Sequence, residues 1–138
     1  MDDPNSAAPA GGTPDPDLWK AVDALWGWLE ASRGTGPGST GRGEELLSRV
    51  LKLSEEVGEV AQAVIGATGQ NPRKGVTHTW QDVESELCDV VITALVALRT
   101  LTPDARRVFA GHLARVTDRS LGEPLPDSSR AESSTENT

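Results

Sequence analysis

Two long segments of this 138-residue chain repeat apolar residues at alternating steps of three and four, and this periodicity constrains the fold more than any other feature. In residues 44–67 the repeat consists of Leu46, Val50, Leu53, Val57, Val60 and Val64. In residues 79–101 it consists of Val83, Leu87, Val90, Ala94, Ala97 and Leu101. Such spacing places apolar side chains on one face of a helix, so both segments are predicted to be amphipathic helices.

Two shorter segments complete the predicted secondary structure. Residues 16–32 carry the same rhythm through Leu18, Val22, Leu25 and Leu29, and stop at the glycine-rich stretch "RGTGPGSTGRG". A fourth helix opens at "TPDA", where Thr102 can cap and Pro103 suits the first helical position, and ends near Leu121. No segment alternates like a strand. The sequence therefore predicts an all-α fold, a four-helix bundle.

Net charge separates the body of the chain from its ends. The total is −8, of which residues 1–17 contribute −4 and residues 122–138 contribute −3, leaving −1 for residues 18–121. The ends lack apolar residues that could offset the entropy of ordering, so we predict disordered tails over residues 1–14 and 122–138 around a helical domain of residues 15–121. A nearly neutral body gives no reason to expect a nucleic-acid partner.

The sequence also bears on the cellular compartment. The single cysteine, Cys88, permits no intramolecular disulfide, which suits a reducing compartment. The N-terminal stretch "MDDPNSAAPAGGTPDPD" has neither the basic nor the apolar region of a signal peptide. The longest apolar stretch, near residues 90–98, is far shorter than the roughly 20 residues of a membrane span. We expect a soluble cytoplasmic protein with no membrane contact.

Carboxylates accompany the apolar repeat in both long segments. Glu56 and Glu59 lie in "LSEEVGEVAQAVIG", residues 53–66, and Glu86 and Asp89 lie in "ELCD", residues 86–89. Each stands one position before an apolar residue of the repeat, which predicts a place on the flank of the buried seam, and the spacing of three stacks each pair on one face. If the two helices pack antiparallel, the two pairs converge.

Four converging carboxylates need a compensating charge, because burial and mutual repulsion both oppose their ionisation. Oxygen ligands with no nearby histidine or cysteine indicate Mg²⁺ or Mn²⁺. A single E-x-x-E pair is often only a solvated helix face, and that alternative applies to either half alone. A carboxylate-bridged di-iron site would need E-x-x-H pairs, which neither His78 nor His112 provides.

The motif "EEVGE" followed by "ELCD" resembles the E-E-x-x-E…E-x-x-D signature of the MazG-like, all-α nucleoside triphosphate pyrophosphohydrolase superfamily. The resemblance covers the second and third predicted helices closely and the others by architecture only. It implies an enzyme that cleaves (d)NTPs between the α- and β-phosphates, releasing a nucleoside monophosphate and pyrophosphate, in a house-cleaning role. It further implies that Glu56, Glu59, Glu86 and Asp89 hold Mg²⁺, and that the bundle is completed by assembly into a homodimer or homotetramer.

Five further polar residues have two interpretations each. Glu55 could orient or deprotonate the attacking water, as the catalytic base, or bind a metal. Lys52, one turn before Glu56, could contact phosphate or form an ordinary ion pair. Asn71, Arg73 and Lys74, in the loop between the acidic helices, could bind the phosphates or sugar of a nucleotide, or form a solvated basic loop.

The stretch "TWQD", residues 79–82, resembles a capping box, so Asp82 is predicted to be structural rather than a metal ligand, and His78 a loop or cap residue.

The alternative to the enzyme is a non-catalytic helical oligomer that binds nucleotides or a protein partner. The complete acidic set favours the enzyme, because a binding protein needs fewer unsatisfied carboxylates.

Overall fold

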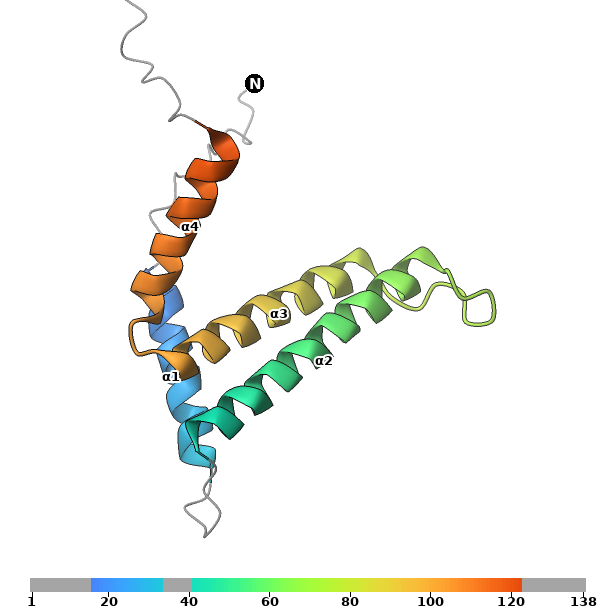
Figure 1. Cartoon of the computed structure of the whole chain (residues 1–138). Coiled ribbons are helices and arrows are strands. Elements are labelled where there is room, and N and C mark those ends of the chain that lie inside the picture. Colours follow the sequence, from blue (N-terminus) through green and yellow to red (C-terminus); the bar gives the residue numbers. More distant parts are fainter. Residues whose placement is uncertain (1–15, 34–40, 123–138) are drawn as a thin grey trace, which may run out of the picture. The chain divides into compact units, whose positions relative to one another are not determined.

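The computed structural model describes residues 16–33 and 41–122, and this part of the chain contains four α-helices and no strand. They are α1 (Pro16–Ser32), α2 (Arg42–Thr68), α3 (Trp80–Leu101) and α4 (Ala105–Leu121) (Figure 1). The predicted all-α class is confirmed. The disordered tails predicted over residues 1–14 and 122–138 lie outside the described residues, apart from Gly122.

The chain divides into two compact units, Met1–Ala105 and Arg106–Thr138. Among the described residues, the first unit contains α1, α2 and α3, and the second contains α4 after its first residue. Gly122 follows α4 with a positive φ of 72°, the left-handed conformation that commonly ends a helix. None of the helices in the described ranges combines the length and the apolar character that crossing a bilayer requires.

The helices α2 and α3 form an antiparallel hairpin, and local signals fix its turn (Figure 1). Gly69 ends α2 in the left-handed conformation, with φ of 64°, and its N–H donates to the carbonyl of Ile65. The predicted capping box begins α3: the Asp82 N–H donates to the Thr79 hydroxyl over 3.1 Å, and the Thr79 N–H donates to the Asp82 carboxylate over 2.8 Å. The structural role predicted for Asp82 is confirmed.

Helix α1 packs against the C-terminal half of α3. Val22 of α1 and Leu95 and Val96 of α3 form a buried apolar cluster, with Trp19 and Leu29 packed around it. The guanidinium of Arg99 lies 3.9 Å from the ring centroid of Trp26, and its Nε donates to the Asp23 carboxylate over 2.7 Å. The apolar cluster and the interactions of Arg99 therefore both join residues that lie far apart in the sequence.

A second contact of α1 is ionic and involves the start of α2. The Arg33 guanidinium lies 2.6 Å from the Glu45 carboxylate, and Arg49 lies 3.4 Å from Glu45 and 3.5 Å from Glu30. We call these four residues, Glu30, Arg33, Glu45 and Arg49, the balanced cluster, because it contains two carboxylates and two guanidinium groups.

Candidate metal centre

The seam between α2 and α3 contains two of the acidic residues themselves. Glu56 is only 7% exposed and Glu86 is half-buried, whereas Val57 and Leu87 are 53% and 50% exposed. The sequence had placed Val57 and Leu87 in the seam and the two glutamates on its flank. The prediction is wrong at these two positions. It is confirmed at Val83 and Ala97 of the same α3 repeat, which are buried, so the seam lies between the predicted apolar stripe and the glutamates.

Small residues explain which face of α2 meets its neighbour. Ala63 is 1% exposed and Gly66 is buried, and both lie on the face that carries Glu56. A Cβ atom on Gly66 would overlap the imidazole of His78 and the hydroxyl of Thr77, so only glycine permits this approach. Apolar residues cover a broad arc of α2, so their spacing alone leaves the rotation open, and the small side chains decide it.

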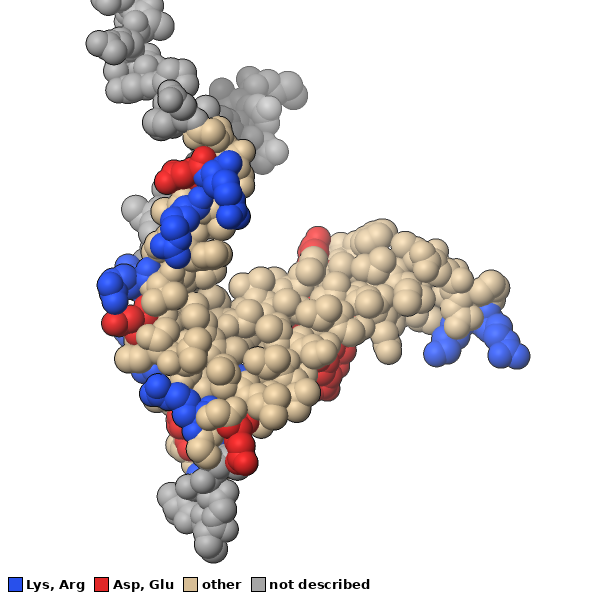
Figure 2. Space-filling view, viewed as in Figure 1, with Lys and Arg blue, Asp and Glu red and all other residues tan. Residues whose placement is uncertain are grey.

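Three of the four predicted ligands converge. Glu56, Glu86 and Asp89 each offer one carboxylate oxygen, and these three atoms lie within 4.8 Å of one another. Oxygens that bind one Mg²⁺ at about 2.1 Å can be at most about 4.2 Å apart, so small side-chain rotations would bring all three onto one ion. Figure 2 shows acidic side chains near the middle of the hairpin and basic ones at its tip.

The fourth predicted ligand, Glu59, lies beside the other three. It is exposed, one turn after Glu56 on α2. Its pKa is raised above the usual range, first because its carboxyl group shares a hydrogen bond with the Glu56 carboxylate, and also through burial and the charges of Glu56 and Glu86. We call Glu56, Glu59, Glu86 and Asp89 the acidic cluster. The raised pKa of Glu59 means that its carboxyl group resists ionisation beside the charged Glu56.

Lys52 is the only basic residue in the described ranges that pairs with the acidic cluster. Its ammonium lies 2.9 Å from Glu56 and 3.2 Å from Glu55. The hydrogen bond from Lys52 is the main reason that the pKa of Glu56 lies below its usual range. Of the two interpretations offered for Lys52, the ion pair with Glu56 is the one the structure contains.

Glu55 stands outside the acidic cluster. Its side chain is 59% exposed and contacts Lys52, which also contacts Glu56. Lys52 therefore links Glu55 to the buried carboxylate without bringing it among the converging oxygens. The role of Glu55 as catalytic base stays a prediction.

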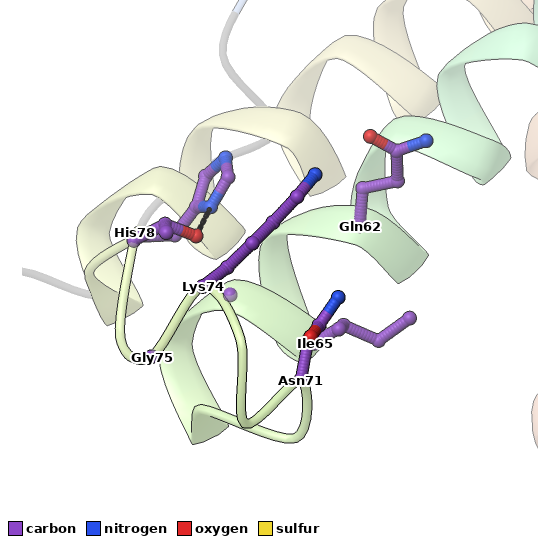
Figure 3. A pocket seen from close by; sticks show the side chains of 8 residues that line it. Gln62, Ile65, Asn71, Lys74, Gly75 and His78 are labelled. Carbon is purple, nitrogen blue, oxygen red and sulfur yellow. Dashed lines mark hydrogen bonds between the residues drawn. The ribbon is translucent and has the colours of Figure 1, made fainter.

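The loop residues predicted to bind substrate separate into two groups. Asn71 and Lys74 line a cavity of about 250 Å³ at the hairpin tip, and Arg73 does not (Figure 3). We call this cavity the tip pocket; its other side chains are Gln62, Ile65, Thr77 and His78, with the backbones of two glycines. Gln62 was missed from the sequence, although it follows Glu59 by three residues and so lies on the same side of α2.

Compared with known proteins, the chain matches no family model, no curated protein and no solved structure. The case for a function therefore rests on the side chains of the hairpin and on the acidic motif.

Proposed function

We propose that this protein is an Mg²⁺-dependent nucleotide pyrophosphohydrolase of the MazG-like type, which cleaves (d)NTPs between the α- and β-phosphates and clears unwanted nucleotides in the cytoplasm. The observation that carries the proposal is the convergence of carboxylate oxygens from Glu56, Glu86 and Asp89 across the seam of α2 and α3. The acidic motif that resembles the superfamily signature supplies these same residues.

The chemistry of the donor set fits a hard divalent cation. Glu56, Glu86 and Asp89 would hold Mg²⁺, Glu59 would complete the set, and Mn²⁺ would suit the same oxygens. When bound, the metal neutralises charge on the triphosphate and lowers the pKa of the attacking water. Lys52 holds Glu55 at the solvent edge of the cluster, where a carboxylate could accept a proton from that water.

Self-association forms part of the proposal. Val57 and Leu87 each follow a seam glutamate by one residue, and Val50 and Val91 lie on the same sides of their helices. In an antiparallel pair these two sides face the same way, so the four residues share one face of the hairpin, and each is about half exposed (49%, 53%, 50% and 56% for Val50, Val57, Leu87 and Val91). An exposed apolar face of this kind favours a homodimer or homotetramer.

The same apolar face also supports the alternative function. A non-catalytic oligomer that binds nucleotides or a protein partner would use this face and would not need hydrolysis. The two hypotheses differ in turnover, which makes them easy to separate.

The test measures products from purified full-length protein and a panel of (d)NTPs with Mg²⁺. We expect a nucleoside monophosphate and pyrophosphate, and reaction in ¹⁸O-labelled water should place the label in the monophosphate, because water attacks the α-phosphorus. A labelled orthophosphate with a nucleoside diphosphate would replace the proposal by a phosphatase. No turnover with any nucleotide would leave the non-catalytic oligomer.

A further inference from the structure

The tip pocket lies on α2 beyond the acidic cluster, toward the end of the hairpin. Gln62, one of its walls, comes three residues after Glu59, about 4.5 Å further along the helix axis, and Gly66 comes one turn later. A ligand with phosphates at the acidic cluster could therefore extend a further group into the pocket. This spatial relation connects the pocket to the proposed function.

The walls of the tip pocket are held in place by the loop's own hydrogen bonds. The carbonyl of Asn71 accepts from the N–H groups of Lys74, over 3.1 Å, and Gly75, over 2.9 Å. The Thr77 N–H donates to the carbonyl of Gly66 over 3.0 Å, and the Nδ1 of His78 lies 2.9 Å from the Thr77 hydroxyl. The loop thus forms a preorganised wall against α2.

These same bonds argue against a phosphate in the pocket. A phosphate-binding loop directs several free backbone N–H groups at the anion. Here the N–H groups of Lys74, Gly75 and Thr77 are all used to fold the loop. The polar side chains that line the cavity are those of Gln62, Asn71, Lys74, Thr77 and His78, and only Lys74 among them carries a full positive charge at neutral pH.

Those side chains are suited to a ring with carbonyl oxygens. Lys74 can only donate hydrogen bonds, and none of the carboxylates in residues 16–33 and 41–122 pairs with its ammonium. Figure 3 shows its side chain extended in the direction of Gln62, whose amide can both donate and accept. Ile65 adds an aliphatic wall. The volume of about 250 Å³ equals about eight water molecules at about 30 Å³ each, more than a single ion needs.

We infer that the tip pocket binds the nucleobase of the substrate and prefers a base with a keto group, which would accept a hydrogen bond from Lys74, over a base with an amino group at that position. The inference rests on the proposed function for its choice of a nucleotide. It assigns Gln62, Asn71 and Lys74 to the base, where the sequence had suggested phosphate or sugar for two of them.

The test uses nucleosides, which contain no phosphate and need no metal. Uridine and cytidine differ at one position, a keto against an amino group, and each would be titrated into the full chain while the amide signals of Gly66, Gly75 and Thr77 are followed by NMR. We expect uridine to bind about tenfold more tightly, the effect of one hydrogen bond to a charged donor. Lys74→Met should remove this preference, and Gln62→Met should weaken binding of both nucleosides.

Arg73→Met is the matched control, because Arg73 is a basic residue of the same loop that does not line the pocket. Equal affinities for uridine and cytidine, or equal effects of Lys74→Met and Arg73→Met, would overturn the inference. Shifts caused by pyrophosphate but not by nucleosides would identify a phosphate subsite and also overturn it. Uridine binding by a protein without turnover would refute the proposed enzyme and keep the base pocket. Turnover that shows no base preference and is unaffected by Lys74→Met would refute the base pocket and keep the proposed enzyme.

Discussion

The balanced cluster and the acidic cluster both hold carboxylates of α2, yet they differ in how the charge is compensated. In the balanced cluster two carboxylates face two guanidinium groups, at distances of 2.6 to 3.5 Å. In the acidic cluster Lys52 forms an ion pair with Glu56 alone among the four carboxylates, and its ammonium also contacts Glu55 outside the cluster. An ion-pair network that only ties helices together has no reason to leave carboxylates without a paired cation, so the imbalance supports the proposed cation site at the acidic cluster.

The largest expected effect follows from removing one converging oxygen. Asp89→Asn or Glu86→Gln should lower Mg²⁺-dependent hydrolysis at least about 100-fold, because each change weakens the hold on a metal that stabilises charge in the transition state. Initial rates of pyrophosphate release at saturating Mg²⁺ measure this. Glu84→Gln is the matched control: Glu84 is an exposed glutamate of α3, two residues from Glu86 and outside the converging group, and should leave the rate within about twofold.

The same variants separate metal binding from catalysis. Mg²⁺ at about 100 times its dissociation constant should stabilise the wild-type fold by about 2.7 kcal/mol, since it binds only the folded cluster. Thermal unfolding with and without Mg²⁺ would measure the gain, which Asp89→Asn should reduce and Glu84→Gln should keep. An undiminished gain in both Glu86→Gln and Asp89→Asn would show that the metal binds elsewhere.

A smaller effect is expected at the balanced cluster, and it should fall on stability alone. Arg49→Met removes one of two guanidinium groups and leaves Glu30 and Glu45 facing each other, with side chains that are only 31% and 12% exposed. We expect a loss of about 1–2 kcal/mol in the free energy of unfolding, measured by urea denaturation. The rate of hydrolysis per folded molecule should stay unchanged, and a selective loss of rate would mean that the two clusters are coupled.

The smallest effect concerns a carboxylate that is compensated by the backbone. Hydrogen bonds from Thr79, first its N–H and then its hydroxyl, hold the pKa of Asp82 below its usual value. A lowered folded pKa means that Asp82 contributes stability above its unfolded pKa of about 3.9, and that this contribution fades as the pH falls through the lower folded value. Asp82→Asn should therefore reduce stability slightly at pH 7 and leave it unchanged near pH 2, as denaturation at the two pH values would show.

Helix positions were predictable from the sequence because their signals are local. The first helix lies at Pro16–Ser32 as its apolar spacing predicts, and the capping box of Thr79 and Asp82 marks the start of α3 one residue before Trp80. These features depend on side chains within a few residues of one another. Apolar period and capping chemistry are therefore enough to find them.

The rotation of α2 against α3 was not predictable in the same way. It depends on Ala63 and Gly66, which are small enough to let α3 and the loop approach, and the sequence signal for such a role is weak. The acidic motif still identified Glu56, Glu86 and Asp89, because their spacing holds for either rotation. The tip pocket needed the folded loop, since His78 and Gln62 meet only after the chain has turned back.

The sequence separation of the contacts sets the order in which this unit can fold. Every residue of the acidic cluster and the tip pocket lies between positions 52 and 89, within one hairpin, whereas Arg99 meets Asp23 across 76 positions. Contacts between near neighbours in the chain form faster than distant ones, because less loop entropy is lost first. The hairpin can therefore close before α1 docks, and closing it brings the carboxylates together. Repulsion among them opposes that early step, so the divalent cation of the proposed function would, by offsetting this repulsion during synthesis, also speed folding.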